Sequence, residues 1–334
     1  MTQYLPKGEY LYAGAELKTA NPKKLQPNAR LQDELLLKVK QPANPAKPLI
    51  WLHYKMGPVE KQRGLKNWLK NKIGKPPVFY DATATEQSKL LMEKHLRDNG
   101  FFHAQVNADT TVEGHRITVN YHINGKGQYS IRNYILPPDS TKLLTLINQK
   151  TKRPLLRPGR PYSLTAIDAE RLRLEQLGRN AGFYEFNQSA LYFYLDTTVQ
   201  ETRQMDVYLA VNPPANEQGY QPHVLGNATI YPDYSLNQND NTATSPDTIR
   251  EAGWTMIQQR PIIELHALQE AIAQDSGALY SEKLKNQAIN YLLDLGVFKF
   301  VNLRYRKDSI NGTAVLHRDF YLTPSLNQDI GVEL

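Results

Sequence analysis

Cysteine is absent from all 334 residues of the chain. This absence excludes disulfide bonds, thiolate metal sites and cysteine nucleophiles together. Long apolar runs are absent too, because no stretch approaches the roughly 20 apolar residues that a membrane-spanning helix needs. With 22% charged and 40% hydrophobic residues, the composition is that of soluble, folded material, and the length gives room for two or three domains.

The sequence also lacks the common catalytic and cofactor motifs. It has no Gly-Lys-Ser/Thr phosphate loop and no His-Glu-x-x-His zinc motif. Gly125 and Gly127 lack the third glycine and the following helix of a dinucleotide site. His103, His115 and His122 fall near predicted strands but show no paired ligand spacing. We therefore expect no enzyme activity, no catalytic residues, no metal and no cofactor.

Excess positive charge is confined to the first third of the chain. Residues 1–125 hold 19 Lys and Arg against 11 Asp and Glu, a net +8, and residues 126–334 hold 21 against 22, a net −1. Such asymmetry concerns partners and surfaces rather than fold.

One stretch, from Pro76 to Phe102, occurs again further along the chain. Pro76 and Pro77 break the preceding structure, Thr83 and Glu86 have the spacing of a capping box, and Asn99-Gly100 ends the helix. The frame returns after 82 residues, and the second copy contains Pro158, Tyr162, Thr165, Leu172, Glu175, Arg179, Gly182 and Phe183 where the first contains Pro76, Tyr80, Thr83, Leu90, Glu93, Arg97, Gly100 and Phe101. A looser third copy runs from Tyr280-Ser281 to Gly296-Val297-Phe298. Three copies indicate a tandem array.

Hydrophobic periodicity gives each unit the order β-α-α-β-β. The predicted fold class is α+β, an array of three units, each a three-stranded mixed sheet with two helices on one face. Gly64 to Ile73 is predicted to be the first helix of the first unit. The expected boundaries are 8–125 with an insertion at about 20–63, 127–213, 221–323 with a flexible loop at 235–248, and a remainder at 324–334 that begins a further element.

The unit order, the Tyr-Asp or Tyr-Ser entry to the second helix and the Gly-Phe or Gly-Val-Phe exit resemble POTRA domains. These are the periplasmic repeats of the BamA/TamA-like outer-membrane assembly family. Three repeats favour the TamA side, and three stretches are similar to the TamA-like lipoproteins of Bacteroidota called TamL: residues 4–11, 76–81 and 295–298.

The resemblance implies a function, a location and partners. It implies a periplasmic scaffold that is the soluble part of a lipid-anchored outer-membrane protein, whose β-barrel would start in residues 324–334. Its partners would be a TamB-like periplasmic protein, unfolded outer-membrane proteins, the chain's own barrel and the inner leaflet of the outer membrane. We expect no nucleic-acid partner and a monomeric fragment.

Open sheet edges are the working surface that this fold predicts, because an outer strand presents unpaired N–H and C=O groups to which an extended client can add. The resemblance places the receptive edge in the strand after the second helix. The predicted edge residues are Phe102, Ala104, Val106, Ala190, Tyr192, Tyr194, Phe298, Phe300 and Asn302. The alternative is that these edges are blunted and structural.

A basic run in the first unit is a second candidate surface. We expect it to meet an acidic partner such as a TamB-like protein, or anionic lipid headgroups. The alternative is a solvated helix face. The run consists of Lys55, Lys61, Arg63, Lys66, Lys70, Lys72 and Lys75.

Two other functions are compatible with the sequence. Small α/β units, 20 tyrosines and a basic first third are also typical of an RNA-binding or single-strand-binding module, although no Gly-Phe-Gly-Phe string occurs. A passive spacer that holds a barrel away from its partner is the third possibility.

Overall fold

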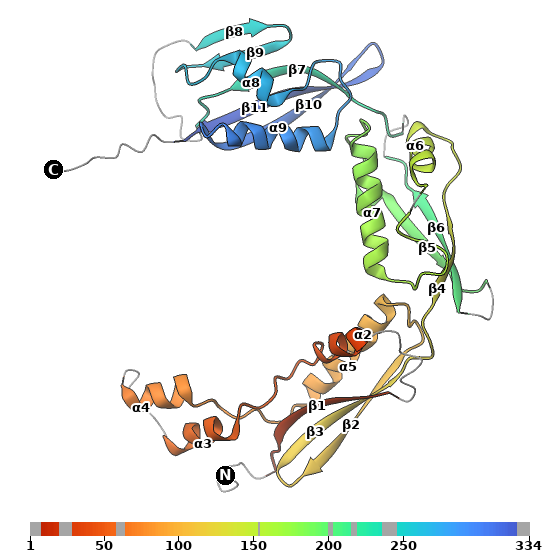
Figure 1. The fold of residues 1–334 in the computed structure, drawn as a ribbon, viewed down its shortest axis with the longest axis vertical. Coiled ribbons are helices and arrows are strands. Elements are labelled where there is room, and N and C mark those ends of the chain that lie inside the picture. The colour runs from red at the N-terminus through yellow and green to blue at the C-terminus, as the bar shows by residue number, and fades with distance from the viewer. Residues whose placement is uncertain are drawn as a thin grey trace, which may run out of the picture. The chain divides into compact units, whose positions relative to one another are not determined.

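The structure is a computed structural model that describes residues 8–19, 29–57, 64–152, 154–199, 203–214, 219–235 and 246–325. The chain divides into two compact units. The first contains residues 1–133, 156–166 and 195–206, and the second contains residues 134–155, 167–194 and 207–334. Three sheets follow one another along the chain, which confirms the predicted α+β class (Figure 1).

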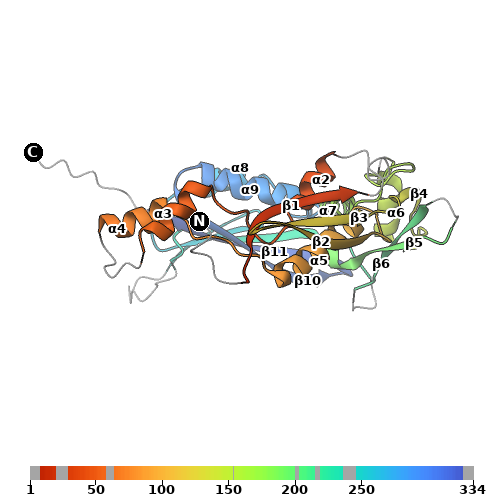
Figure 2. The same ribbon diagram turned by 90° about the horizontal axis from the view of Figure 1, so that it is seen from below.

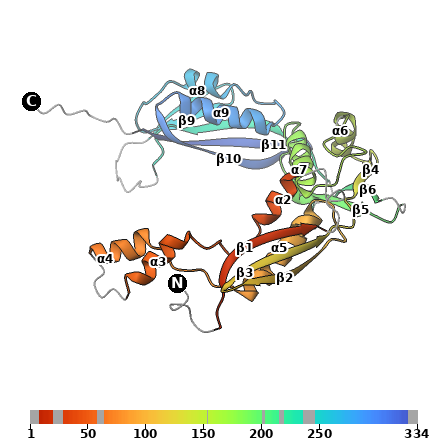
Figure 3. The same ribbon diagram turned by 60° about the horizontal axis from the view of Figure 1, so that its bottom comes forward.

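The first sheet has the order β1-β3-β2. Its strands are β1 (Leu11–Thr19), β2 (Gln105–Glu113) and β3 (Arg116–Asn124), with β1 parallel and β2 antiparallel to β3. Helices α2 (Ala29–Leu36) and α5 (Ala82–Asp98) lie against it (Figure 3). Leu31 and Leu35 of α2 pack with Met92 and Leu96 of α5 on the strand residues, so these two helices close the first core.

This arrangement corrects the predicted first helix. The segment 64–73 is split into α4 (Leu65–Trp68) and a π-helix (Leu69–Ile73), and with α3 (Lys47–Lys55) it lies outside the first core (Figure 3). Leu65 is 73% exposed and Trp68 is 51% exposed. The helical spacing of apolar residues does not say which helix reaches the sheet. We call residues 47–57 and 64–75 the insert.

Caps set the start of α5 differently from the prediction. Asp81 is the N-cap, and its carboxylate accepts the Thr83 N–H at 2.8 Å, so Thr83 lies inside the helix. The end is as predicted, with Gly100 at φ +84 donating its N–H to the Arg97 carbonyl. Only glycine adopts this backbone conformation without strain.

The second sheet has the order β4-β6-β5. Its strands are β4 (Ser130–Ile135), β5 (Leu191–Asp196) and β6 (Gln204–Val211). Its helices are α6 (Lys142–Lys150), which Thr141 caps, and α7 (Leu164–Arg179). Leu143 and Ile147 of α6 and Leu174 of α7 share one core with Leu191 and Leu209 of the strands.

The third sheet is wider than predicted, because it has five strands in the order β10-β11-β7-β9-β8. The three predicted strands are β7 (Val224–Tyr231), β10 (Phe298–Ile310) and β11 (Thr313–Pro324). The additional hairpin is β8 (Asp247–Glu251) and β9 (Trp254–Gln258), and β9 pairs in parallel with β7. Residues 247 and 248 of the predicted flexible loop are thus strand residues, and residues 236–245 lie outside the described residues.

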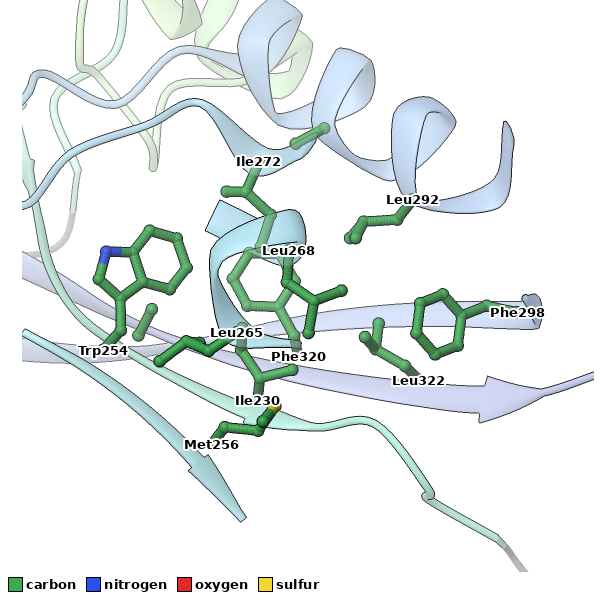
Figure 4. Packing of buried hydrophobic residues seen from close by; sticks show 12 residues of the cluster. Ile230, Trp254, Met256, Leu265, Leu268, Ile272, Leu292, Phe298, Phe320 and Leu322 are labelled. Carbon is green, nitrogen blue, oxygen red and sulfur yellow. The ribbon is translucent and has the colours of Figure 1, made fainter. Parts of the chain in front are cut away.

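Helices α8 (Leu265–Ile272) and α9 (Glu282–Asp294) lie side by side on one face of the third sheet (Figures 1 and 2). Figure 4 shows Leu268 and Ile272 of α8 and Leu292 of α9 above Ile230 and Phe320 of the strands, all in one buried cluster. The helices therefore cover the centre of the sheet.

The repeated tyrosine and glycine make the same backbone contacts twice. In what we call the first junction (Gly100, Phe102, Tyr129 and Tyr162), which lies inside the first compact unit, the Tyr129 N–H donates to the Gly100 carbonyl and the Tyr162 N–H donates to the Tyr129 carbonyl, both at 2.9 Å.

The second junction (Gly182, Tyr184, His223 and Tyr280) lies inside the second compact unit. There the His223 N–H donates to the Gly182 carbonyl at 2.9 Å, and the Tyr280 N–H donates to the His223 carbonyl at 3.0 Å. At both junctions, the glycine that follows a helix (α5 or α7) thus binds the backbone just before the first strand of the next sheet (β4 or β7).

Candidate functional site

The strand after the second helix is an outer strand in every sheet. β2, β5 and β10 each pair with one neighbour, namely β3, β6 and β11. Within the described ranges, one side of each strand therefore lacks a neighbouring strand in its sheet. The predicted edge residues fall on or just before these strands.

In the first sheet, the edge begins later than predicted. β2 starts at Gln105, so Phe102 and Ala104 lie in the preceding turn, and only Val106 is a strand residue. The ring of Phe102 packs on Tyr129 and Tyr162 at centroid distances of 5.3 and 5.1 Å. Phe102 is therefore a residue of the first junction, and Ala104 packs against the first core.

A side chain also blunts this edge. The Glu93 carboxylate of α5 accepts the backbone N–H of Val106 at 3.0 Å. This N–H is one that an added strand would need, because Val106 belongs to the outer strand. Sequence reasoning identified Glu93 as a repeated residue but missed this role. The signal was its recurrence as Glu175 in the second copy, where the carboxylate accepts from the Gln188 amide at 2.8 Å instead.

In the second sheet, Ala190 lies in a short 3-10 turn before β5, so it too precedes the strand. Tyr192 and Tyr194 are strand residues, and their side chains are exposed. Arg171 of α7 reaches the Leu191 carbonyl at the start of the strand, with Nε 3.4 Å from the oxygen. The usable edge of β5 is consequently short.

In the third sheet, β10 is the longest of the three edges, with 13 residues against 9 in β2 and 6 in β5. Phe298 is buried in the core, whereas Phe300 is 60% exposed and Asn302 is exposed. Among the described residues, no side chain hydrogen-bonds a backbone group of residues 299–307, and the first such contact is the Ser309 N–H on the Asp308 carboxylate at 2.7 Å. β10 is thus the most accessible edge.

The basic run lies on the insert. Lys55 on α3, Lys66 on α4, and Lys72 and Lys75 further along are exposed. Lys70 already makes a hydrogen bond within the insert, because its Nζ donates to the Gly57 carbonyl at 2.7 Å. Lys61 and Arg63 lie outside the described residues. Leu65, Trp51 and Trp68 of the insert are exposed as well.

A cluster of charged side chains lies beside the second junction. Arg179 donates from Nε and Nη2 to Glu282 Oε2 at 3.0 and 2.6 Å, and Lys285 donates to Glu282 Oε1 at 2.8 Å. The Tyr280 hydroxyl also donates to Glu282. Burial alone would raise the pKa of Glu282, but the bonds from Lys285, Tyr280 and Arg179 outweigh it and lower this pKa to about 2.

The sequence pointed to Arg179 but not to its partner. Glu282 stands two residues after the repeated tyrosine, and the corresponding residues of the other copies are Ala82 and Leu164. The one sequence signal for this ion pair was that only the third copy has a carboxylate, Glu282, at this position. The cluster is a structural one, because each of its charges is paired within the chain.

A second ion pair lies at the second sheet. Asp206 accepts from Arg132 Nε at 2.8 Å and from the Asn133 amide at 3.0 Å. The bond from Arg132 lowers the pKa of Asp206. Two of the histidines are also engaged separately, with His122 Nε2 2.7 Å from Asp109 Oδ2 and His103 Nε2 3.3 Å from the Tyr129 hydroxyl.

Within the described ranges, no group of three or more His, Asp or Glu side chains could hold a metal ion. In that same part of the chain, no helix has both the length and the apolar character for crossing a membrane.

Comparison with known proteins gives one family match. Residues 60–126 match the POTRA family, described as "Surface antigen variable number repeat". This range covers α4, the π-helix, α5, β2 and β3. No curated protein matches the sequence.

Three of the solved structures to which the chain is similar contain POTRA domains or belong to CdiB. POTRA domains 3–5 of BamA from Haemophilus influenzae are 12% identical, with 96% of this chain and 99% of that chain covered and a TM-score of 0.39. POTRA domains 1–3 of Omp85 from Anabaena are 8% identical, with 96% and 97% covered and a TM-score of 0.30. CdiB from Acinetobacter baumannii is 10% identical, with 60% and 30% covered and a TM-score of 0.23.

Proposed function

We propose that this chain is a periplasmic scaffold of an outer-membrane translocation and assembly factor, and that it binds unfolded client strands and partner proteins by β-augmentation. One observation carries the proposal: the strand after the second helix is an outer strand in all three sheets. Backbone hydrogen bonds at such an edge give affinity with little regard to client sequence. The POTRA match at residues 60–126 supports it, and a TamA-like or TamL-like assignment is part of the same proposal.

The three edge strands differ in how much of their backbone is free to pair with a client, and this difference ranks them as client-binding edges. β10 is long and its residues 299–307 carry no side-chain bond to the backbone among the described residues, so it is the first client edge. β5 is short, and Glu93 blocks Val106 of β2. Clients should therefore contact β10 most and β2 least.

Site-specific photo-crosslinking to an unfolded outer-membrane protein tests this ranking. We expect strong labelling from Asn302, weaker labelling from Tyr194 and little from Asn107, with exposed Glu270 on α8 as the control position. The substitution Glu93→Ala should raise labelling at Asn107, because it frees the Val106 N–H. Equal labelling at Glu270 and Asn302 would exclude an edge-specific client site and favour a passive spacer.

The nucleic-acid alternative has its own outcome in binding assays. A module of that class would bind single strands with an affinity that falls steeply with salt. We expect no such binding, since residues 126–334, which contain the second and third copies of the repeat, hold 21 Lys and Arg against 22 Asp and Glu and so carry no positive excess together.

We further propose that the insert contacts an anionic lipid surface such as the inner leaflet of the outer membrane. Exposed lysines lie there with exposed Trp51, Leu65 and Trp68. Tryptophan together with lysine is typical of surfaces that sit at a membrane interface, where apolar rings enter the headgroup region and ammonium groups stay in water. An acidic protein such as a TamB-like partner would use the lysines but would gain less from these apolar side chains.

Vesicle co-sedimentation separates the two partners. Each lysine near an anionic surface contributes about 1 kcal/mol, so the triple substitution Lys66→Gln, Lys72→Gln and Lys75→Gln should weaken binding to anionic vesicles strongly. Trp68→Ser should weaken it as well while leaving the charge unchanged. If Trp68→Ser has no effect and the lysine substitutions do, the surface meets an acidic protein rather than a lipid. Binding of the triple variant equal to that of the parent would overturn the proposal for both partners.

A further inference from the structure

A groove lies at the opposite margin of the third sheet, away from β10. It occupies about 510 Å³ and is lined by Ile249 and Glu251 of β8, Met256 and Gln258 of β9, and Ile262 and Ile263 before α8. All these residues belong to the second compact unit. The groove is independent of the β2, β5 and β10 edges.

The groove exists because the sheet is too wide for its helices. A five-stranded sheet is about 19 Å across between its outer strands, whereas two packed helices have axes about 10 Å apart. Helices α8 and α9 lie on one face of the sheet, and β8 is at its margin beyond β9 (Figure 1). The face of β8 that bears Ile249 is consequently left partly uncovered, and the Ile249 side chain is exposed.

The groove is lined by two carboxylates, Glu251 and Glu264, and Glu264 Oε2 lies 3.1 Å from Nδ1 of His266, which also lines it. Gln258 is only 5% exposed, yet its Oε1 has no hydrogen-bond partner among the described residues. A buried acceptor without a donor costs about 1–3 kcal/mol, so a ligand that brings a donor recovers this free energy. Glu251 on the rim adds a carboxylate, and no bond to it is present in the described part of the chain.

The walls favour an aliphatic stem. Ile249, Met256, Ile262 and Ile263 form an apolar passage between the rim and Gln258. Lysine and arginine bury their methylene groups on such surfaces while the charged head pairs with acceptors. β8 itself is an outer strand, so an extended backbone can lie along it.

We propose that this margin is a second peptide-binding site, at which an extended basic peptide adds to β8 and places one lysine or arginine side chain in the groove, within reach of Glu251 and Gln258.

Fluorescence anisotropy with designed peptides tests the site on the whole chain. The probe is a labelled nine-residue peptide of alternating threonine and valine with a central arginine, and its matched controls carry a central glutamate or leucine. A fourth peptide keeps the arginine but is N-methylated at alternate residues, which removes the N–H groups of one edge. We expect the arginine peptide to bind most tightly and the N-methylated peptide to lose binding.

Substitutions in the chain locate the peptide. Glu251→Gln and Gln258→Leu should each weaken the arginine peptide by roughly tenfold, the loss of one hydrogen bond to a charged group, and Phe300→Ala on β10 should leave binding unchanged. Gln258→Leu removes an unpaired buried group and is expected to fold, which keeps the test valid.

Equal affinities for the arginine and glutamate peptides, or unchanged binding in both groove variants, would overturn the proposal. Loss of binding in Phe300→Ala alone would place the peptide on β10. That result would overturn the groove site while supporting the proposed function.

Discussion

The two junctions share a backbone and differ in their side chains. Both use a glycine carbonyl as the acceptor and a tyrosine N–H as the second donor. In the first junction the ring of Phe102 packs on the rings of Tyr129 and Tyr162. In the second, Tyr184 packs on Tyr280 at 5.1 Å and Arg179 pairs with Glu282 beside them.

The difference arises at a single position of the repeat. Arg97 and Arg179 are equivalent in the 82-residue frame, but the residue two after the following tyrosine is Leu164 in one copy and Glu282 in the other. Arg97 is exposed, whereas Arg179 donates to Glu282, Tyr280 and the Tyr184 carbonyl. Both copies thus keep the same backbone hydrogen bonds at the junction, and the carboxylate of Glu282 adds an ion pair to the second one.

The largest expected effect comes from filling the space beside a junction glycine. A Cβ on Gly100 would lie 3.1 Å from Tyr162 Cβ and 3.2 Å from the Tyr162 carbonyl oxygen, at φ +84. We expect Gly100→Ala to lower the free energy of unfolding by about 3 kcal/mol, from backbone strain plus this close contact. Urea denaturation and amide exchange at Tyr129 measure it.

Gly296→Ala is the matched control. Gly296 has a similar φ of +72, but no atom lies within 4 Å of the added Cβ. Only the backbone strain of about 1 kcal/mol should remain. Equal losses in the two variants would show that contact at the first junction does not matter.

The second expected effect is a difference between Arg179 and Arg97 in what each contributes to the free energy of unfolding. Arg179→Met leaves Glu282 without its guanidinium partner and should lower the free energy of unfolding by about 2 kcal/mol, while Arg97→Met should change it by less than about 0.5 kcal/mol. A double-mutant cycle with Glu282→Gln gives the coupling energy. A coupling near zero would mean that Arg179 acts through packing on Tyr184 alone.

The third effect is a pH dependence confined to the second junction. The pKa of Glu282 falls from 4.5 to about 2 on folding. The ionised Glu282 therefore contributes fully to the free energy of unfolding above about pH 4.5, and this contribution is lost as the pH falls toward 2. The contribution is on the order of 1–2 kcal/mol, reduced from the full linkage value because the side chain is partly exposed.

Amide exchange at His223, compared with Tyr129, over pH 2–5 follows this loss at the second junction. In Glu282→Gln the extra acid sensitivity of His223 should disappear. If the parent and this variant lose protection at His223 in parallel, another group is responsible.

The smallest expected effect is an increase in the free energy of unfolding. Leu164→Glu places a carboxylate at the position of the repeat that corresponds to Glu282, and Arg97 is the residue that corresponds to Arg179. An exposed pair contributes at most about 1 kcal/mol, so we expect a slight rise in the free energy of unfolding relative to Leu164→Gln. High salt should abolish the difference between these two variants, and a difference that persists in salt would not be electrostatic.

Local signals in the sequence predicted much of the fold because they depend on neighbouring residues. Gly100 ends a helix through its own backbone, and strand alternation identified β3 and β6. The starts of α5 and β2 were displaced by a few residues, since Asp81 rather than Thr83 caps the helix and Phe102 packs in a junction.

The candidate site was predicted only in outline. The resemblance to POTRA domains placed the receptive edge in the strand after each second helix, but Glu93 blocking Val106 and the open backbone of β10 depend on side chains that meet across the fold. The hairpin β8–β9 was missed as a hairpin because it follows a polar segment, and its place beside β7 is a long-range pairing.

The sequence by itself determined that a helix followed by two strands occurs three times, because helix caps, apolar periodicity and recurring glycine and tyrosine residues act over a few residues of chain. The tertiary structure alone decided which amphipathic helix covers the first sheet, α2 rather than α4, and which sheet edges stay open. Those outcomes depend on burial and hydrogen bonding between residues far apart in the chain, and the apolar pattern of a helix is the same whichever partner it finds.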